Sequence, residues 1–104
     1  MLYKAKNTKE QVIQTKILKD LEASNIWCFK TIRCNRRGIP DIVGILKNGI
    51  FFAIEVKTEK GKATELQKLE IEAITSNKGL CAICHSFEDY QVFKKQLLTE
   101  NLKV

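Results

Sequence analysis

The sequence is poor in several features that would restrict its class. It contains one proline and one histidine among 104 residues, and no stretch rich in glycine or serine divides it. We therefore expect residues 1–104 to form a single domain. No apolar run approaches the ~20 residues that a membrane span needs, and the residues from Met1 to Asn7 lack the apolar stretch of a signal peptide. We expect an intracellular, cytoplasmic protein with no membrane partner, whose four cysteines are mostly reduced.

Familiar phosphate and hydrolase motifs are also missing. There is no P-loop, no glycine-rich dinucleotide fingerprint and no Gly-x-Ser-x-Gly, which argues against nucleotide-driven motors, a nucleotide cofactor and serine hydrolases. The charge balance is basic, with a formal net charge of +6 and a pI near 9.2. Such a balance favours a polyanion, most often nucleic acid, although a solvated basic surface without a specific partner is the alternative.

Hydrophobic periodicity and turn signals predict an α/β fold with the order α-β-β-β-α-β-α. The expected elements are a helix over 8–23, a strand over 26–32, strands over 41–46 and 50–57, a helix over 64–77, a strand over 80–85 and a helix from 87 to about 99. Both faces of the 41–57 hairpin are largely apolar. We therefore expect helices to cover both sides of the sheet.

The register of that hairpin decides which side chains share a face. A two-residue turn would place Asp41 opposite Val56, on the other face from Glu55. A three-residue loop with Gly49 in a left-handed conformation instead pairs Leu46 with Ile50, and hence Asp41 with Glu55. We expect the three-residue loop.

Asp41, Glu55 and Lys57 are charged residues within otherwise apolar strand sequence. Glu55 and Lys57 are two residues apart and therefore point to the same side of a strand. Two neighbouring carboxylates repel each other unless a cation or proton lies between them, and oxygen ligands suit Mg²⁺. The pattern predicts metal-assisted phosphodiester hydrolysis. The alternative is an ordinary surface pair of Glu55 with Lys57, and a turn residue at Asp41.

Two further polar residues are candidates for the same site. Glu10 shares a helical face with Ile13 and Ile17, so it is expected to point toward the sheet and reach the metal directly or through water. Its alternative is a capping box with Asn7. Gln67 can reach the site with its amide or cap the helix with Thr64; the sequence leaves the two roles open.

Between Glu22 and Asp41 there is no acidic residue, and the cations there form a candidate DNA-binding set. Its members are Lys30, Arg33, Arg36 and Arg37. The two adjacent arginines precede the Asp41 strand and can clamp phosphate, with a solvated loop as the alternative.

The cysteines raise a separate possibility. A Cys-x-x-Cys at Cys81 and Cys84, with Cys28 and Cys34, suggests a small zinc protein. On a strand, however, residues three apart face opposite sides, which favours buried cysteines that act as small apolar side chains.

The sequence resembles the VRR-NUC branch of the PD-(D/E)xK nucleases, from about Lys9 to Leu98. The likeness rests on Gly38-Ile39-Pro40-Asp41-Ile42, Ala53-Ile54-Glu55-Val56-Lys57, Gln67, an acidic residue before Val12-Ile13, and Asn77-Lys78-Gly79 before an apolar strand. The chain is similar to minimal stand-alone members carried by phages and bacteria.

The resemblance implies a restriction-endonuclease-like core with a mixed sheet flanked by helices. It implies Mg²⁺ or Mn²⁺ held by Asp41, Glu55 and the Val56 carbonyl, with Lys57 orienting the attacking water. Glu10 would match the family's N-terminal acidic residue, and Gln67 its additional helix residue. It also implies a homodimer acting on branched DNA such as a four-way (Holliday) junction. A nicking or restriction-type nuclease on duplex DNA and a catalytically silent DNA-binding module are the alternatives.

Overall fold

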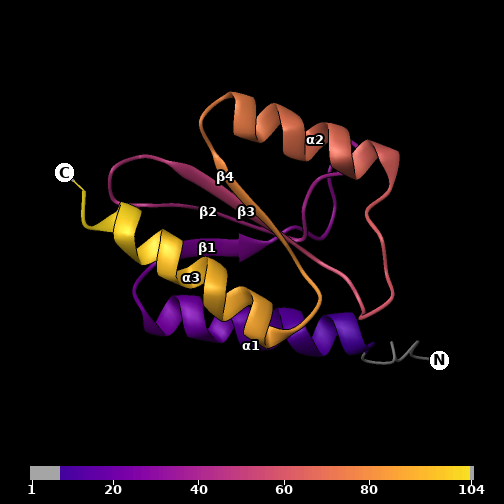
Figure 1. The fold of residues 1–104 in the computed structure, drawn as a ribbon, viewed down its shortest axis with the longest axis horizontal. Helices are drawn as coiled ribbons and strands as arrows, with labels where there is room; N and C mark the ends of the chain where they lie inside the picture. The colour runs from indigo at the N-terminus through magenta and orange to yellow at the C-terminus, as the bar shows by residue number, and fades with distance from the viewer. Residues whose placement is uncertain (1–7, 104) are drawn as a thin grey trace.

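The computed structural model describes residues 8–103, and the order of its elements is the predicted one. The elements are α1 (Lys9–Ala23), β1 (Trp27–Lys30), β2 (Ile42–Ile45), β3 (Phe51–Val56), α2 (Glu65–Ser76), β4 (Leu80–Cys84) and α3 (Phe87–Asn101). Helices α1 and α3 lie on one side of the sheet and α2 lies on the other (Figure 1). The expected α/β architecture with helices on both faces is confirmed.

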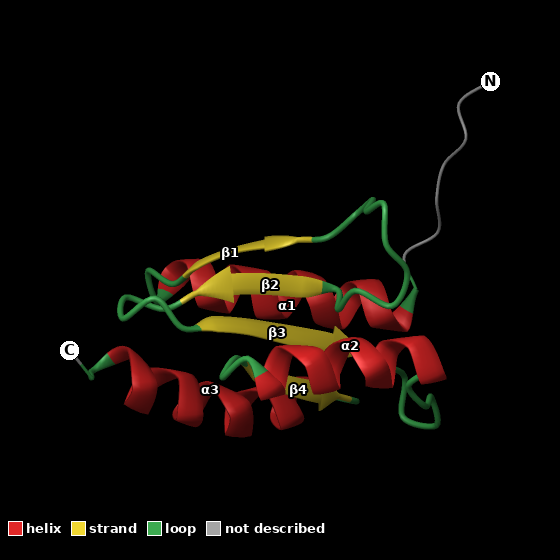
Figure 2. Ribbon diagram, turned by 90° about the horizontal axis from the view of Figure 1, so that it is seen from above, coloured by secondary structure: helices red, strands yellow, loops and turns green. Residues whose placement is uncertain are grey.

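The sheet is mixed, with the strand order β1-β2-β3-β4. The β1–β2 and β2–β3 pairs are antiparallel, and the β3–β4 pair is parallel because α2 provides the crossover between these strands. Helix α2 lies over the β3–β4 half of the sheet and leaves β1 and β2 without a covering helix on that side (Figure 2). This uneven cover exposes part of the same sheet face that carries the charged residues.

The β2–β3 hairpin has the predicted register. The Leu46 amide donates to the Ile50 carbonyl at 2.9 Å, and Gly49 has a φ of 89°. Glycine adopts this left-handed conformation at little cost. The bond between Leu46 and Ile50, together with the left-handed Gly49, defines a three-residue loop. Ile42 lies opposite Ile54, and the next position along each strand therefore places Asp41 opposite Glu55.

The hydrophobic core lies between the sheet and the α1/α3 layer. Alternate residues of β3, among them Phe52 and Ile54, point into it and meet Ile17 of α1 and Leu97 of α3. Gly44 is needed beside this core, because a Cβ there would lie 2.5 Å from the Phe52 ring. The other face of β3 thereby presents Glu55 toward α2.

The helix caps agree with the sequence except at α1. Thr64 and Ser86 cap α2 and α3 as expected. Helix α1, in contrast, is capped by Thr8, with Gln11 completing the capping box. The predicted cap, Asn7, lies outside the described residues, and the pairing of Asn7 with Glu10 was wrong by one residue. Glu10 is therefore free of the capping role that competed with its place at the site.

The end of β1 and the turn after α2 also differ from the sequence prediction. The first strand is shorter than the predicted 26–32, because the chain beyond Lys30 leaves the ladder for the arginine-containing loop. Helix α2 ends at the expected place, but Lys78, with φ 69°, takes the left-handed position rather than Gly79. None of the helices within residues 8–103 has the length and apolarity to span a membrane.

Candidate active site

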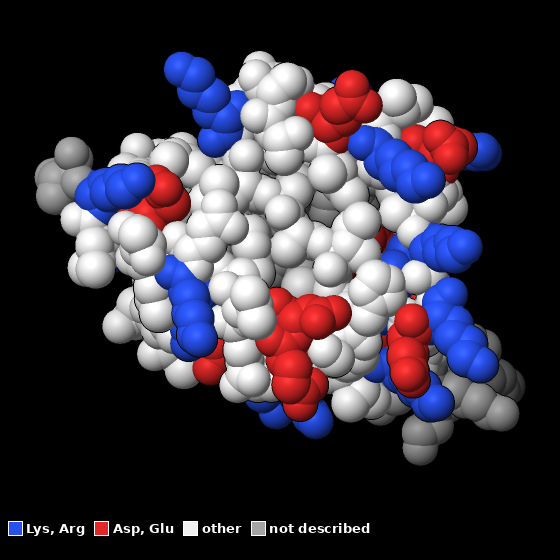
Figure 3. Space-filling view, in the orientation of Figure 1, with Lys and Arg blue, Asp and Glu red and all other residues white. Residues whose placement is uncertain are grey.

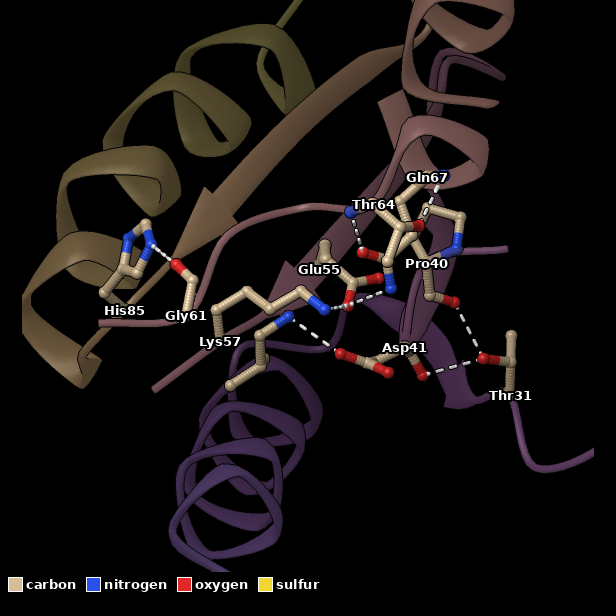
Figure 4. A network of polar contacts seen from close by, with 10 residues as sticks. Thr31, Pro40, Asp41, Glu55, Lys57, Gly61, Thr64, Gln67 and His85 are labelled. Carbon is tan, nitrogen blue, oxygen red and sulfur yellow. Dashed lines mark hydrogen bonds and ion pairs between the residues drawn. The ribbon is translucent and has the colours of Figure 1, made fainter. Parts of the chain in front are cut away.

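The predicted charged residues meet on the α2 side of the sheet. Asp41 immediately precedes β2, Glu55 is near the end of β3, and Lys57 directly follows that strand. Gln67 approaches from the first turn of α2 (Figure 4). The site therefore joins two neighbouring strands and one helix, and the antiparallel register brings the two carboxylates together.

Asp41 is held by its neighbours on both sides. The Val56 amide donates to Asp41 Oδ2 at 2.8 Å, which fixes the carboxylate against β3. The Thr31 amide donates to the Asp41 carbonyl at 2.8 Å, and Thr31 Oγ1 donates to the Pro40 carbonyl at 2.7 Å. Thr31 was not anticipated as a site residue, although its place at the end of the first predicted strand could have suggested the contact.

Glu55 is the most deeply buried charged residue of the site, with 3% of its surface exposed. Its Oε2 accepts a hydrogen bond from Gln67 Nε2 at 3.0 Å and lies 3.5 Å from Lys57 Nζ. Its Oε1 is buried with no hydrogen-bond partner among the described residues. Burial, and then the neighbouring Asp41 charge, raise the pKa of Glu55 to about 7, while Lys57 opposes the shift.

Gln67 combines both roles that the sequence left open. Its Oε1 accepts from the Thr64 amide at 2.8 Å, which completes the capping box of α2. Its Nε2 donates to Glu55. Because one amide supplies both bonds, the start of α2 is tied directly to the Glu55 carboxylate.

The site fits a hard divalent cation. A buried carboxylate oxygen without a partner, opposite a second carboxylate, is a costly arrangement that a cation would relieve. Mg²⁺ commonly uses one or two protein carboxylates and keeps several waters. Within residues 8–103 no three His, Cys, Asp or Glu side chains gather as a metal site, so Glu10, half-buried in the first turn of α1, does not join Asp41 and Glu55 in such a group. Contact of Glu10 through water, like coordination by the Val56 carbonyl, stays a prediction.

The four predicted DNA-binding cations do not all lie at the site. Arg33 and Arg36 line a hollow of about 180 Å³ that also reaches Asp41. Arg36 forms an ion pair with Glu70 of α2, whereas Arg33 and Arg37 have no ion pair in the part of the chain that the structure describes. Lys30 lies beside Ile42, whose side chain points to the α1/α3 face, so the pleat directs Lys30 away from Asp41.

The four cysteines do not form a common metal site within residues 8–103. Cys84 is buried in the core and Cys81 is on the opposite face of β4, as the strand alternation predicts. No group of three or more metal-binding side chains involves them within residues 8–103. Burial raises the pKa of the Cys81 thiol to about 11, which is the behaviour of an inert apolar residue.

The sequence assigned no structural role to two further polar residues, His85 and Gln14. His85 Nε2 lies 3.0 Å from the Gly61 carbonyl, so the histidine ties the end of β4 to the loop between Lys57 and α2 (Figure 4). Gln14 is buried in α1, and its Oε1 lacks a partner among the described residues. Its helical spacing to Ile17 and Leu21 was the signal that could have found it.

Lysine and arginine side chains are more numerous at the end of the molecule where the β3–α2 loop and the start of α1 lie, while the surface over β4 is largely uncharged (Figure 3). Lys9 and Lys60 line a hollow there together with His85. Positive charge therefore accompanies the carboxylates at the same end of the sheet.

Comparison with known proteins identifies the family. The model of the VRR-NUC domain family matches residues 3–88. The chain belongs to the VRR-NUC domain family. A solved structure named VRR_NUC domain has 30% identical residues and a TM-score of 0.70, over 92% of this chain and 99% of that one. No curated protein matches the chain significantly. Membership implies a nuclease-type fold with DNA as the partner, and the expected resemblance is confirmed.

Proposed function

We propose that this VRR-NUC domain protein is a metal-dependent endonuclease that hydrolyses phosphodiester bonds in branched or structured DNA. The observation that supports the proposal most strongly is the buried Glu55 carboxylate. Its Oε1 has no hydrogen-bond partner within residues 8–103, and Asp41 lies opposite it across the β2–β3 hairpin. Without a ligand, this arrangement lowers the stability of the folded protein, because a buried carboxylate oxygen without a hydrogen-bond partner is destabilising. The arrangement is useful once a divalent cation binds.

Asp41, Glu55 and the Val56 carbonyl would hold Mg²⁺ or Mn²⁺, with Glu10 reaching it through water. The bound cation would supply Lewis-acid polarisation of the phosphate and a more acidic water. Among the protein's own groups, Lys57 is 15% exposed at its side chain and projects from the strand end beside Glu55. It is placed to orient the attacking water and to stabilise the negative charge that grows in the transition state. Gln67 keeps Glu55 in position through its 3.0 Å hydrogen bond.

DNA recognition is proposed to rest on shape rather than base sequence. The described elements include no helix or ribbon that projects from the fold as a base-reading module. Arg33, Arg36 and Arg37 lie in the loop that leads to Asp41, where they can contact phosphates near the cleaved bond. Such contacts provide affinity without sequence information, so flexibility at a branch point would decide the substrate.

A homodimer is part of the proposal. One chain carries one site, and symmetric cleavage of two strands needs two sites. A C2 dimer is the simplest arrangement that supplies them, and a four-way junction has matching two-fold symmetry. We expect the protein to act inside a bacterial or phage-infected cell, where such DNA occurs.

The test is cleavage of a matched DNA panel with Mg²⁺ and with Mn²⁺. The panel contains a four-way junction, a flap, a splayed arm and a linear duplex, and Glu55→Gln serves as the control for contaminating nuclease. Metal-dependent cutting of the junction that Glu55→Gln abolishes is the expected result. Cutting of linear duplex instead would favour a nicking or restriction-type nuclease. Tight binding without any cleavage would favour a silent DNA-binding module.

A further inference from the structure

His85 is the one histidine of the chain, and no step of the proposed hydrolysis uses it. It stands between β4 and Ser86, the N-cap of α3. Its backbone amide donates to Asp89 Oδ2 at 2.8 Å, and its ring Nε2 lies 3.0 Å from the Gly61 carbonyl oxygen. A carbonyl oxygen can only accept, so Nε2 carries the hydrogen of this bond. The ring thus joins the start of α3 to a loop 24 residues earlier in the chain.

The Gly61 carbonyl belongs to a turn that directly follows Lys57. The Gly61 amide donates to the Thr58 carbonyl at 2.9 Å, which closes the turn over residues 58–61. A Cβ atom placed on Gly61 would lie 3.2 Å from the Cβ of Lys57, closer than side-chain atoms normally pack. The turn therefore folds back against the Lys57 side chain, and it does so at the residue that His85 holds.

Lys57 is held in two ways, and only one of them concerns its side chain. The Lys57 amide donates to the Cys84 carbonyl at 2.9 Å, so β4 fixes the backbone. A bond to the backbone leaves the long, flexible lysine side chain free to rotate. The side chain is nevertheless only 15% exposed, and its Nζ lies 3.5 Å from Glu55 Oε2. The 58–61 turn packs on the first carbon of that side chain and limits the directions in which it can extend.

We propose that His85 is a positioning residue for Lys57 and acts through the 58–61 turn. The hydrogen bond from His85 Nε2 holds Gly61 against the lysine, which extends away from the histidine toward Glu55 (Figure 4). Within residues 8–103, His85 forms no hydrogen bond or ion pair with Lys57 or Glu55 themselves. The inference deepens the proposed function and rests on the role that this function gives to Lys57.

Two amide side chains separate the hydrogen bond from the other properties of the histidine. Glutamine places its NH₂ group near the position of the imidazole Nε2, whereas the shorter asparagine reaches only the position of Nδ1. His85→Gln should therefore keep the bond to Gly61, and His85→Asn and His85→Ala should lose it. The His85 side chain is 38% exposed, so none of these substitutions leaves a cavity in the core.

The first measurement uses the full chain without metal or DNA, so its result is independent of nuclease activity. Lysine amines are acetylated with N-acetoxysuccinimide, and the rate at Lys57 is followed by peptide mass spectrometry. Lys57 should react several-fold faster in His85→Ala and His85→Asn than in the wild type, because a released turn lets its side chain reach solvent more often. His85→Gln should react at the wild-type rate. Lys16, exposed on α1, is the internal reference and should react equally in every variant.

The second measurement relates the hydrogen bond to cleavage. Single-turnover rates are measured with saturating protein on the DNA that the wild type cuts, and DNA affinity is measured by fluorescence anisotropy in EDTA. His85→Ala and His85→Asn should lower the cleavage rate roughly 10-fold and change the Kd for DNA by no more than about two-fold, because a displaced catalytic group loses rate without loss of binding. The melting temperature should stay near that of the wild type. His85→Gln should restore the rate.

Equal acetylation of Lys57 in the wild type and His85→Ala would overturn the proposal, because the turn would then not need the histidine. Slow cleavage by His85→Gln, or a parallel loss of DNA affinity and melting temperature in His85→Ala, would overturn it in favour of a general structural role. A wild type that cuts no DNA in the panel would refute the proposed function instead. The acetylation rates would then decide by themselves whether His85 positions Lys57.

Discussion

Replacing Glu55 by glutamine should stabilise the metal-free protein while it abolishes cleavage. The carboxylate is buried beside Asp41, and its pKa rises from 4.5 to about 7. A raised carboxyl pKa means that the folded state binds the proton more tightly than the unfolded state does. Stability from this proton is therefore fully present below pH 4.5 and is lost as the pH rises to about 7.

The size of the effect follows from the linkage relation. Each pH unit between the two pKa values is worth about 1.4 kcal/mol, so the wild type loses up to about 3 kcal/mol by neutral pH. Glutamine has nearly the same shape and no charge. Its amide can keep an oxygen toward Gln67 and Lys57 and direct its NH₂ group toward Asp41. In a domain of about 100 residues, this gain raises the melting temperature on the order of 10 °C.

The assay is thermal unfolding in EDTA from pH 4 to pH 9 for the wild type and Glu55→Gln. The melting temperatures of the two proteins should nearly coincide at pH 4. As the pH rises to about 7, the melting temperature of Glu55→Gln should increasingly exceed that of the wild type. Glu72→Gln is the matched control, because Glu72 is exposed on α2 and its carboxylate has no hydrogen-bond or ion-pair partner within residues 8–103. Parallel pH profiles for the wild type and Glu55→Gln would refute the reasoning that burial and Asp41 destabilise the Glu55 carboxylate.

Three further predictions concern other parts of the molecule. Lys57→Ala should abolish cleavage but change DNA affinity by only a few-fold, because Lys57 acts in the transition state; normal turnover in the panel assay would remove this role. Replacing Arg36 and Arg37 together by alanine should weaken DNA binding and flatten its salt dependence, and an unchanged slope in a fluorescence-anisotropy titration would show that the loop does not touch phosphate. Tyr90→Phe should destabilise the fold by about 1 to 2 kcal/mol in urea unfolding, since the buried hydroxyl donates to Asp20 at 2.6 Å; an unchanged midpoint would contradict that estimate.

Metal addition gives a related test of the site. Binding requires an ionised Glu55, so the apparent Mg²⁺ affinity should rise with pH up to about 7 and then level off. Calorimetric titrations at several pH values measure this, with Glu55→Gln as the variant that should not bind. An affinity that does not change with pH would indicate that Glu55 is not a ligand.

The sequence alone determined the order of the elements and the hairpin register. Period-two and helical apolar patterns are local, and the Lys47-Asn48-Gly49 loop dictates which residues pair across β2 and β3. From that register the shared face of Asp41, Glu55 and Lys57 followed directly. The exact cap of α1 did not, because Asn7 with Glu10 and Thr8 with Gln11 both fit the capping-box pattern, and the structure has the second pair.

Only the tertiary structure decided how far the site is buried and what surrounds it. The bond from Gln67 to Glu55, the Thr31 contacts that fix Asp41 and the Arg36–Glu70 pair join segments that are distant in sequence. The opening of β1 and β2 on the α2 side depends on α2 lying over the other half of the sheet, which no local pattern encodes. Side-chain periodicity specifies which face of an element is apolar, whereas the packing of whole layers determines which part of that face remains open.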